Sequence, residues 1–373
     1  MADNFSNKGY EDYFKALERQ LNKSGAPEVK KVAEPEVKPE AARKHSKGVY
    51  KVIKLRKSVI AVVLVLCLVA VSSVIIAAVS KNKAETKPQI SDAENKEPKI
   101  EHKPSISYTI PDDVTDVVLE NDAKSIVIVD KEAKKVVAAR NPHTREYPAS
   151  TTKIMTLLVA VENITDWDAK FTMTLDITDP LFVAEASVAG FLNGEQVSMT
   201  DLLYGTILPS GADAAMGLAI SVAGSEEEFV KLMNDKVKEL GLRNTNFTNV
   251  TGLHNENNYS SAYDLAIILD AALQNETCKK VLSTYQYKTA VTPQHPEGIE
   301  LSGTLFSYMY GTEPETATIL GGKTGFVNES GYCIASYGKG NESSKEYIIV
   351  TMGNTGRWPA FYGQIDLYKH YAK

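Results

Sequence analysis

The chain has 373 residues, of which 43% are hydrophobic and 24% are charged, and its net charge is -6. This length and composition are ordinary for one large globular domain or two small ones. The net charge argues against nucleic acid as a partner. Three cysteines are too few for a disulfide framework, and six scattered histidines without an HExxH string give a zinc site little support.

Residues 1–57 are rich in Lys, Glu and Pro, and this composition predicts a mostly disordered tail. Apolar residues recur at helical spacing between about residues 11 and 22. We expect an amphipathic helix there that docks on a cytoplasmic partner or on the inner membrane face. The alternative is a nascent helix that has no partner.

Residues 58–80 carry no charge and predict one transmembrane helix. A helix of this length measures roughly 35 Å, enough to cross a hydrocarbon core of about 30 Å. Basic residues crowd the N-terminal flank, whereas the C-terminal flank mixes both signs, so we expect a cytoplasmic N-terminus and an extracytoplasmic remainder. A cleaved secretory signal is the competing interpretation, because Ala78-Val79-Ser80 resembles a cleavage site, but the preceding tail is far too long for a signal peptide.

Residues 81–115 alternate charges with prolines, and we expect a stalk that holds a domain away from the membrane. That domain is predicted over residues 116–373. Strands are expected at 125–130, 135–139, 320–324, 333–337 and 347–352, and helices at 151–163, after the capping residues Ser225 and Ser261, and at 361–371. Strands at both ends and helices between them predict an α+β fold with one antiparallel sheet faced by helices.

Three short strings in this domain predict the site of a serine acyl-transferase. They are Ser150-Thr151-Thr152-Lys153, Ser210-Gly211-Ala212 and Lys323-Thr324-Gly325. A serine hydroxyl needs an adjacent base to become a nucleophile, and a lysine three residues later on a helix lies on the same face. Similar strings in the tail and beside the span lie outside any predicted core, so order and context carry the specificity.

Each string also has a purely structural interpretation. Ser150 could cap the helix that follows it, with Lys153 as a solvated side chain. Ser210 after Pro209 could belong to a turn. Lys323 could lie at a strand end beside a bulge, and Gly321-Gly322-Lys323-Thr324 imitates the end of a phosphate loop whose first glycine is replaced by Ala317.

With these strings the chain resembles the low-molecular-mass penicillin-binding proteins that act as serine D-alanyl-D-alanine carboxypeptidases. The resemblance covers about residues 123–368. It also includes the strings Tyr147-Pro148-Ala149 before the serine, Asp201-Leu202-Leu203-Tyr204-Gly205, Thr251-Gly252-Leu253, Tyr259-Ser260-Ser261-Ala262-Tyr263-Asp264-Leu265 and Phe326 after the third string.

The resemblance implies a penicillin-recognising DD-peptidase/β-lactamase-like domain with a five-stranded sheet and a helical subdomain. It implies Ser150 as nucleophile, Lys153 as its base and Ser210 as the proton relay to the leaving D-alanine. Lys323, Thr324 and Gly325 would bind substrate, with Lys323 facing the terminal carboxylate, and the backbone of Ser150 and Phe326 would form the oxyanion hole. The implied ligands are peptidoglycan stem peptides and β-lactam inhibitors, and neither a cofactor nor a metal is required.

The second string departs from the family pattern, which usually ends in Asn where this chain has Ala212. One alternative is therefore a catalytically impaired penicillin-binding or wall-scaffold protein, and another is that Asp213 or a water takes over the Asn role. A class A β-lactamase is less favoured, because the only Glu-x-x-Leu-Asn string begins at Glu18 in the tail. Whether Cys278 and Cys333 form a disulfide is left open.

Overall fold

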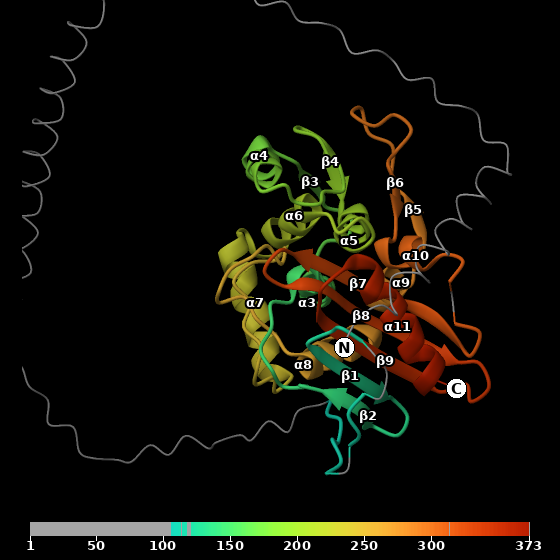
Figure 1. The fold of residues 1–373 in the computed structure, drawn as a ribbon. Helices are drawn as coiled ribbons and strands as arrows, with labels where there is room; N and C mark the ends of the chain where they lie inside the picture. The colour runs from blue at the N-terminus through green and yellow to red at the C-terminus, as the bar shows by residue number, and fades with distance from the viewer. Residues whose placement is uncertain (1–105, 113, 118–120, 313, 373) are drawn as a thin grey trace, which may run out of the picture. The chain divides into compact units, whose positions relative to one another are not determined.

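A five-stranded antiparallel sheet in the order β2-β1-β9-β8-β7 lies at the centre of the fold (Figure 1). The computed structural model describes residues 106–112, 114–117, 121–312 and 314–372. The sheet strands are β1 Ser125–Asp130, β2 Lys135–Arg140, β7 Ala317–Val327, β8 Gly331–Gly340 and β9 Glu346–Asn354. The early hairpin pairs with the late strands through β1 and β9, so the predicted sheet built from both ends of the domain is confirmed.

Helices cover both faces of this sheet. α8 packs against β1 and β9, whereas α11 packs against β8 and β9. The helices are η1 Ala149–Thr152 (a 3-10 turn), α3 Lys153–Asn163, α4 Leu175–Val183, α5 Met199–Ile207, α6 Ala212–Ala223, α7 Glu226–Glu239, α8 Ala262–Leu273, α9 Glu276–Leu282, α10 Thr304–Met309 and α11 Arg357–Tyr371. Two small hairpins pair β3 Lys170–Thr172 with β4 Gln196–Ser198, and β5 Gln286–Lys288 with β6 Glu300–Ser302.

The strand β1 shows why the sheet needs helices on both sides. Its side chains alternate between the two faces, as the pleat requires. Val127 and Val129 belong to the larger core, and Ile126 and Ile128 to the smaller core, which also includes residues of α10 and α11. Both faces of β1 are therefore apolar and fully buried. This explains why the sequence of β1 is a continuous apolar run, without the alternation of apolar and polar residues that a half-exposed strand shows.

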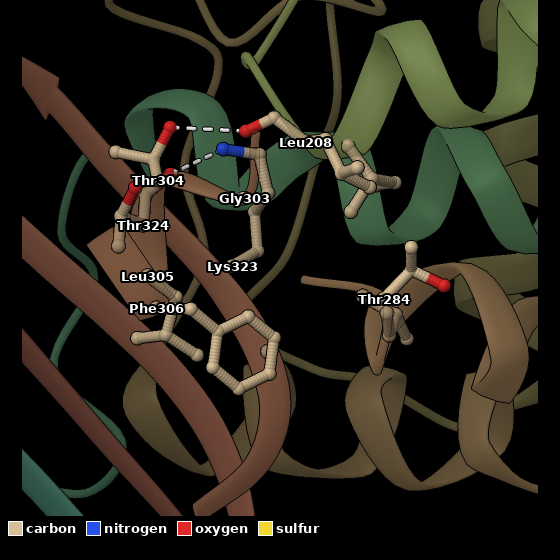
Figure 2. Close-up of a pocket in the computed structure, with 11 residues that line it drawn as sticks. Leu208, Thr284, Gly303, Thr304, Leu305, Phe306, Lys323 and Thr324 are labelled. Atoms are coloured by element: carbon tan, nitrogen blue, oxygen red, sulfur yellow. Dashed lines mark hydrogen bonds between the residues drawn. The ribbon is translucent and has the colours of Figure 1, made fainter. Parts of the chain in front are cut away.

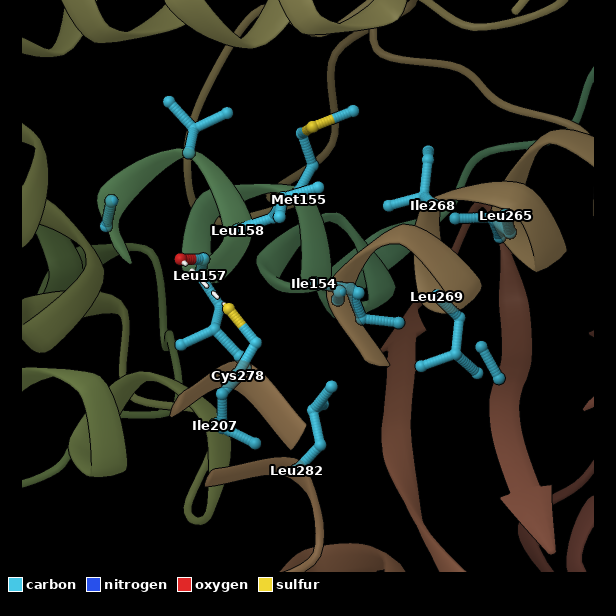
Figure 3. Packing of buried hydrophobic residues seen from close by; sticks show 14 of the residues in the cluster. Ile154, Met155, Leu157, Leu158, Ile207, Leu265, Ile268, Leu269, Cys278 and Leu282 are labelled. Carbon is cyan, nitrogen blue, oxygen red and sulfur yellow. Dashed lines mark hydrogen bonds between the residues drawn. The ribbon is translucent and has the colours of Figure 1, made fainter. Parts of the chain in front are cut away.

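The helix α3 runs through the larger core and fixes the position of its own first residue, Lys153. Figure 3 shows Ile154, Leu157 and Leu158 of α3 near the side chains that α8 and α9 contribute. A helix that is apolar on every side is stable only when buried on every side. The start of α3 is consequently held rigidly, and so is the η1 turn joined to it.

Both predicted helix caps are confirmed. The hydroxyl of Ser225 accepts a hydrogen bond from the N–H of Glu228, and the hydroxyl of Ser261 accepts one from the N–H of Asp264. The predicted helix at 361–371 begins earlier, at Arg357. The late strands are longer at both ends than their apolar cores suggested.

Part of the expected stalk packs on the domain. Ile106 and Tyr108 are buried, and the Tyr108 hydroxyl donates to Oδ2 of Asp270 on α8 at 2.6 Å. The packed domain therefore begins before residue 116, because two apolar side chains in a polar stretch are enough to attach it. The predicted tail, the span at 58–80 and the remainder of the stalk lie outside the described residues. Among the described helices, none is long and apolar enough to cross a membrane.

Candidate active site

Ser150 and Lys153 are joined by a hydrogen bond at the start of α3. Lys153 Nζ donates to Ser150 Oγ at 3.0 Å and to the carbonyl oxygen of Thr251 at 2.6 Å. Ser150 lies inside η1, whose N-cap is Pro148, and no side chain caps this turn. The capping interpretation of Ser150 is therefore wrong, and its hydroxyl faces the lysine amine instead.

Burial changes the acid–base behaviour of Lys153. Only 2% of this residue is exposed. Burial disfavours the charged amine and lowers the pKa of Lys153 to about 7, although the negative charge of Asp213 acts in the opposite direction. A neutral amine within hydrogen-bond reach of a hydroxyl is suited to accept its proton.

Two glycines hold the backbone around Ser150 from opposite sides. A Cβ on Gly252, whose φ is +77°, would lie 1.9 Å from the carbonyl oxygen of Ala149. A Cβ on Gly325 of β7 would lie 2.8 Å from the backbone nitrogen of Ser150. Ala149 itself has a φ of +48°, a conformation that costs free energy in a residue with a side chain. The close approach of both glycines positions the nucleophile against the edge strand β7.

Lys323 lies on β7 and is almost completely buried. Its Nζ donates to the carbonyl oxygen of Thr324 at 2.8 Å. Burial and the nearby positive charge of Lys153 lower the pKa of Lys323 well below its ordinary value. Lys323 and Thr324 line a small cavity of about 10 Å³ together with Leu208 and Thr304 (Figure 2). The phosphate-loop interpretation is wrong, because residues 321–324 are part of a paired strand.

A larger cavity of about 620 Å³ opens beside Ser150 and Lys153. Its wall includes Ala212 from the second string and Phe326 from the end of β7. The structure thus brings the first string, the last residue of the second and the residue after the third around one pocket. This volume is in the range of small-molecule and peptide sites.

The second string occupies the connection between α5 and α6. Ser210 has a φ of +66° and is 8% exposed, and it lines neither cavity. Backbone hydrogen bonds hold this connection: the N–H of Gly211 donates to Gly205, and the N–H of Ala212 donates to the carbonyl oxygen of Ser187 at 2.8 Å. The string therefore shapes the pocket wall through its backbone.

Asp213 is not among the residues that line the larger cavity, whereas a side chain that takes over the role of the family's Asn would have to line it. Its two carboxylate oxygens accept the backbone N–H groups of Ala189, Gly190 and Phe191 at 2.7, 3.0 and 3.2 Å. The Asp213 carboxylate thus anchors the segment that follows α4. This role was not expected from sequence, because it depends on a loop distant in the chain.

Thr251 is a second contributor that lies outside the three catalytic strings, in the string Thr251-Gly252-Leu253 that the resemblance already included. The side-chain oxygen of Asn249 accepts the N–H groups of Thr251 and Gly252 and so fixes the turn whose carbonyl binds Lys153. The string Asn-Val-Thr-Gly is a turn signal that marks this position.

Cys278 and Cys333 are both buried free thiols. Among the described residues, no group of three or more His, Cys, Asp or Glu side chains is placed to hold a metal ion.

Known proteins are similar to this chain in sequence. DacF of Bacillus subtilis, a D-alanyl-D-alanine carboxypeptidase, is 38% identical over 230 residues, which are 60% of this chain and 56% of that protein. DacA of Escherichia coli, which has the same description, is 32% identical over 238 residues, or 62% and 56% of the two chains. The chain thus spans about half the length of these curated relatives.

Solved structures share the fold as well. The crystal structure of the Streptomyces K15 DD-transpeptidase matches with a TM-score of 0.60 and 29% identity, over 69% of this chain and 99% of that one. Penicillin-binding protein 5 from Haemophilus influenzae matches with a TM-score of 0.58 and 28% identity, over 68% and 72%. The sequence family described as D-alanyl-D-alanine carboxypeptidase matches residues 112–356, which contain all three strings and the whole sheet. The chain therefore belongs to the D-alanyl-D-alanine carboxypeptidase family.

Proposed function

We propose that this protein is a serine-type D-alanyl-D-alanine carboxypeptidase that removes the terminal D-alanine from peptidoglycan stem pentapeptides. The observation that carries the proposal is the buried Lys153 amine, 3.0 Å from Ser150 Oγ, with a pKa lowered to about 7. This pair supplies an activated nucleophile near neutral pH. Family membership supports the choice of a D-alanyl-D-alanine substrate.

In the proposed reaction Lys153 takes the hydroxyl proton while Ser150 Oγ bonds to the carbonyl carbon of the penultimate D-alanine. The C–N bond to the terminal D-alanine then breaks, and Ser210 relays a proton to the departing amine. Water hydrolyses the resulting ester, which restores the Ser150 hydroxyl and releases the shortened stem. Backbone N–H groups of Ser150 and Phe326 stabilise the oxyanion, a contribution of roughly 3–4 kcal/mol for each donor.

Lys323 is proposed to bind the terminal carboxylate with the help of Thr324 and Gly325. Without substrate, burial and Lys153 disfavour the charged form of Lys323. A substrate carboxylate beside it would favour the ammonium form. Substrate binding should therefore bring a proton to Lys323, and this gain selects for ligands that end in a free carboxylate. A β-lactam carries such a carboxylate and is the expected inhibitor class.

A non-catalytic wall-binding or scaffold function is the second candidate. The observation that favours it is Ala212, which gives the pocket wall a methyl group where the family pattern has a carboxamide. Comparing pentapeptide levels in cells that carry the native chain or Ser150→Ala distinguishes the two functions. Equal levels would support scaffolding, and accumulation of pentapeptide in the variant would support turnover.

We further propose that residues 58–80 anchor the protein in the cell membrane, with residues 1–57 in the cytoplasm and the catalytic domain outside. The support is the uncharged run and the basic residues that precede it. Protease added to intact cells should then degrade the catalytic domain and spare a tag at the N-terminus. Loss of both from intact cells, or a mature N-terminus that follows Ser80, would reject the anchor.

The first test of catalysis is the intact mass of the full-length chain after incubation with benzylpenicillin. We expect one covalent adduct on the native chain and none on Ser150→Ala. Release of D-alanine from a diacetylated tripeptide that ends in D-Ala-D-Ala should show the same dependence on Ser150. An adduct without D-alanine release would leave the scaffold as the better function, and no adduct at all would reject an activated serine.

A further inference from the structure

A row of aromatic side chains leads away from the pocket along the outer part of β7, β8, α10 and α11. The rings of Phe326 and Tyr332 stack with centroids 4.3 Å apart. The Arg357 guanidinium carbon lies 6.0 Å from the Tyr332 ring centroid and 4.9 Å from that of Tyr308. Tyr308 contacts Trp358 at 5.9 Å between centroids. We call these five residues, with Tyr362 stacked on Trp358 at 6.0 Å, the aromatic row.

Tyr308, Tyr332 and Tyr362 of the aromatic row are half-buried and pack against the smaller core, whereas its other two rings are exposed. Phe326 is 47% exposed and Trp358 is 40% exposed. Arg357 is also exposed, and the ion pairs formed among the described residues do not include it. Contiguous exposed apolar surface is uncommon on a soluble domain and marks interaction sites. Ring-to-ring contacts along the row also keep the side chains in fixed orientations, which lowers the entropy cost of binding.

The aromatic row is continuous with the pocket that contains Ser150. Phe326 lines the 620 Å³ cavity on one side and stacks on Tyr332 on the other. These two residues are also cross-strand partners in the register of β7 and β8. From Phe326 at the pocket, the contacts lead to Tyr332 on β8 and then to the Arg357 guanidinium on α11.

The chemistry of the row suits an amino-sugar chain. Each pyranose ring has an apolar C–H face that packs flat on an aromatic ring, and a rim of hydroxyl and acetamido groups that hydrogen-bond. The planar Arg357 guanidinium carries five N–H donors and lies near the Tyr332 and Tyr308 rings. It can serve the polar rim while the exposed rings of Phe326 and Trp358 serve the apolar face.

We propose that the aromatic row binds the glycan strand of peptidoglycan next to the stem peptide that occupies the pocket. This inference deepens the proposed function, on which it rests for the identity of the strand. In the stem peptide of peptidoglycan the sugar lies at the end opposite the terminal D-alanine, and the row lies on the Phe326 side of the pocket. The row therefore lengthens the substrate site from the stem peptide to the sugars that carry it.

Binding is tested with the full-length chain in detergent and purified glycan strands from which an amidase has removed the stem peptides. Trp358→Ala and Tyr332→Ala should each raise the Kd about threefold to tenfold, because one aromatic stacking contact is lost in each. Trp167→Ala is the matched control, since Trp167 is 43% exposed but lies outside the row, and its Kd should stay unchanged. Equal Kd values for all four proteins, or no binding by the native chain, would overturn the proposal.

Kinetics then separate this inference from the proposed function. For a disaccharide pentapeptide, the row variants should raise KM about threefold to tenfold with kcat unchanged. For the sugar-free tripeptide, the same variants should match the native chain, which also shows that they fold. Equal losses on both substrates would reject a sugar subsite. If the native chain cleaves neither substrate, the proposed function fails, and the glycan-binding measurement still decides whether the row binds sugar.

Discussion

The pocket wall that Ser150 and Lys153 form, the Ser150 wall, and the wall that Ala212 of the second string forms, the Ser210 wall, are held in place by different means. The first wall is joined by side-chain contacts, since Lys153 binds both Ser150 Oγ and the Thr251 carbonyl. The second wall is held by backbone groups and by the Asp213 carboxylate, which accepts four backbone N–H groups, three of them from residues 189–191. No hydrogen bond joins the Ser210 hydroxyl to another described residue.

The difference indicates that chemistry and shape are assigned to separate parts of this site. The Ser150 wall is complete before substrate arrives, because burial has already adjusted Lys153 and two glycines already hold the nucleophile. Ala212 offers the substrate no polar side chain, and the Ser210 hydroxyl, which the proposed reaction uses only as a proton relay, is not held by another described residue. The Ser150 wall should therefore be sensitive to loss of a side chain, and the Ser210 wall to loss of backbone support.

The largest effect is expected from Lys153→Met. Removal of the general base should slow acylation by benzylpenicillin about 10²- to 10⁴-fold, while Met retains most of the buried volume. Rapid-quench mass spectrometry measures the rate. Lys170→Met on the exposed strand β3 is the control and should acylate like the native chain. Rapid acylation of Lys153→Met by benzylpenicillin would show that the reactivity of Ser150 does not depend on the Lys153 amine.

The pH dependence tests the same wall without a mutation. Acylation should rise with pH through an apparent pKa of about 7, where Lys153 becomes neutral, and at pH 5 it should be about 100-fold slower than on the plateau. Lys153 loses its proton near pH 7 in the folded chain but near 10.5 when unfolded. The unfolded state therefore binds more protons between about pH 7 and 10.5, and the contribution of Lys153 to stability should rise across that window.

Stopped-flow acylation at pH 5–9 and urea unfolding at pH 7–10 check both statements. Lys153→Met should lose the pH dependence of stability that comes from this amine. A flat acylation profile between pH 5 and 8 would mean that the amine is neutral throughout, or that another group serves as base.

The backbone-held wall should fail when Asp213 is removed. Asp213→Ala leaves the backbone N–H groups of residues 189–191 without their side-chain acceptor, and we expect a loss of about 2–4 kcal/mol in the free energy of unfolding. Acylation should fall about tenfold, because the segment that lines the pocket is no longer positioned. Asp235→Ala on the exposed face of α7 is the control, with a change of at most about 0.5 kcal/mol. Urea unfolding measures the loss of stability, and the acylation rate measures the loss of activity. If both values for Asp213→Ala equal those of the native chain, Asp213 does not support the Ser210 wall.

Much of the fold followed from local pattern, because local chemistry decided it. Helix caps such as those at Ser225 and Ser261 depend only on neighbours in the chain. The strand at 125–130 depends only on its run of apolar residues and on their burial, with Ile126 and Val127 on opposite faces of the sheet. The hydrogen bond of Lys153 to Ser150 also followed, since a spacing of three residues places both on one side of a helical turn.

The remainder of the site depends on segments far apart in sequence. The Thr251 carbonyl reaches Lys153 only after the turn fixed by Asn249 folds against η1. Asp213 binds the segment at 189–191 only after α4 and α6 have packed. The attachment of Tyr108 to Asp270 has the same origin, and it moved the start of the packed domain. Polar contacts of this kind leave no periodic signal in the sequence.

The smallest effect is expected from Ala212→Asn, which tests whether the Ser210 wall lacks a hydrogen-bonding side chain for the substrate. Ala212 and Lys153 line the same pocket, so we expect a carboxamide at position 212 to bond to a substrate amide there. One added hydrogen bond should raise the kcat/KM for a D-Ala-D-Ala tripeptide by a factor of about three to ten. Ala212→Ser, which adds a hydroxyl with shorter reach, is the matched control and should gain less. A gain for Asn alone would show a wall that is shaped correctly but poor in substrate contacts. A loss in both variants would show that the methyl group of Ala212 suits the substrate of this chain, because any added bulk would then obstruct the pocket.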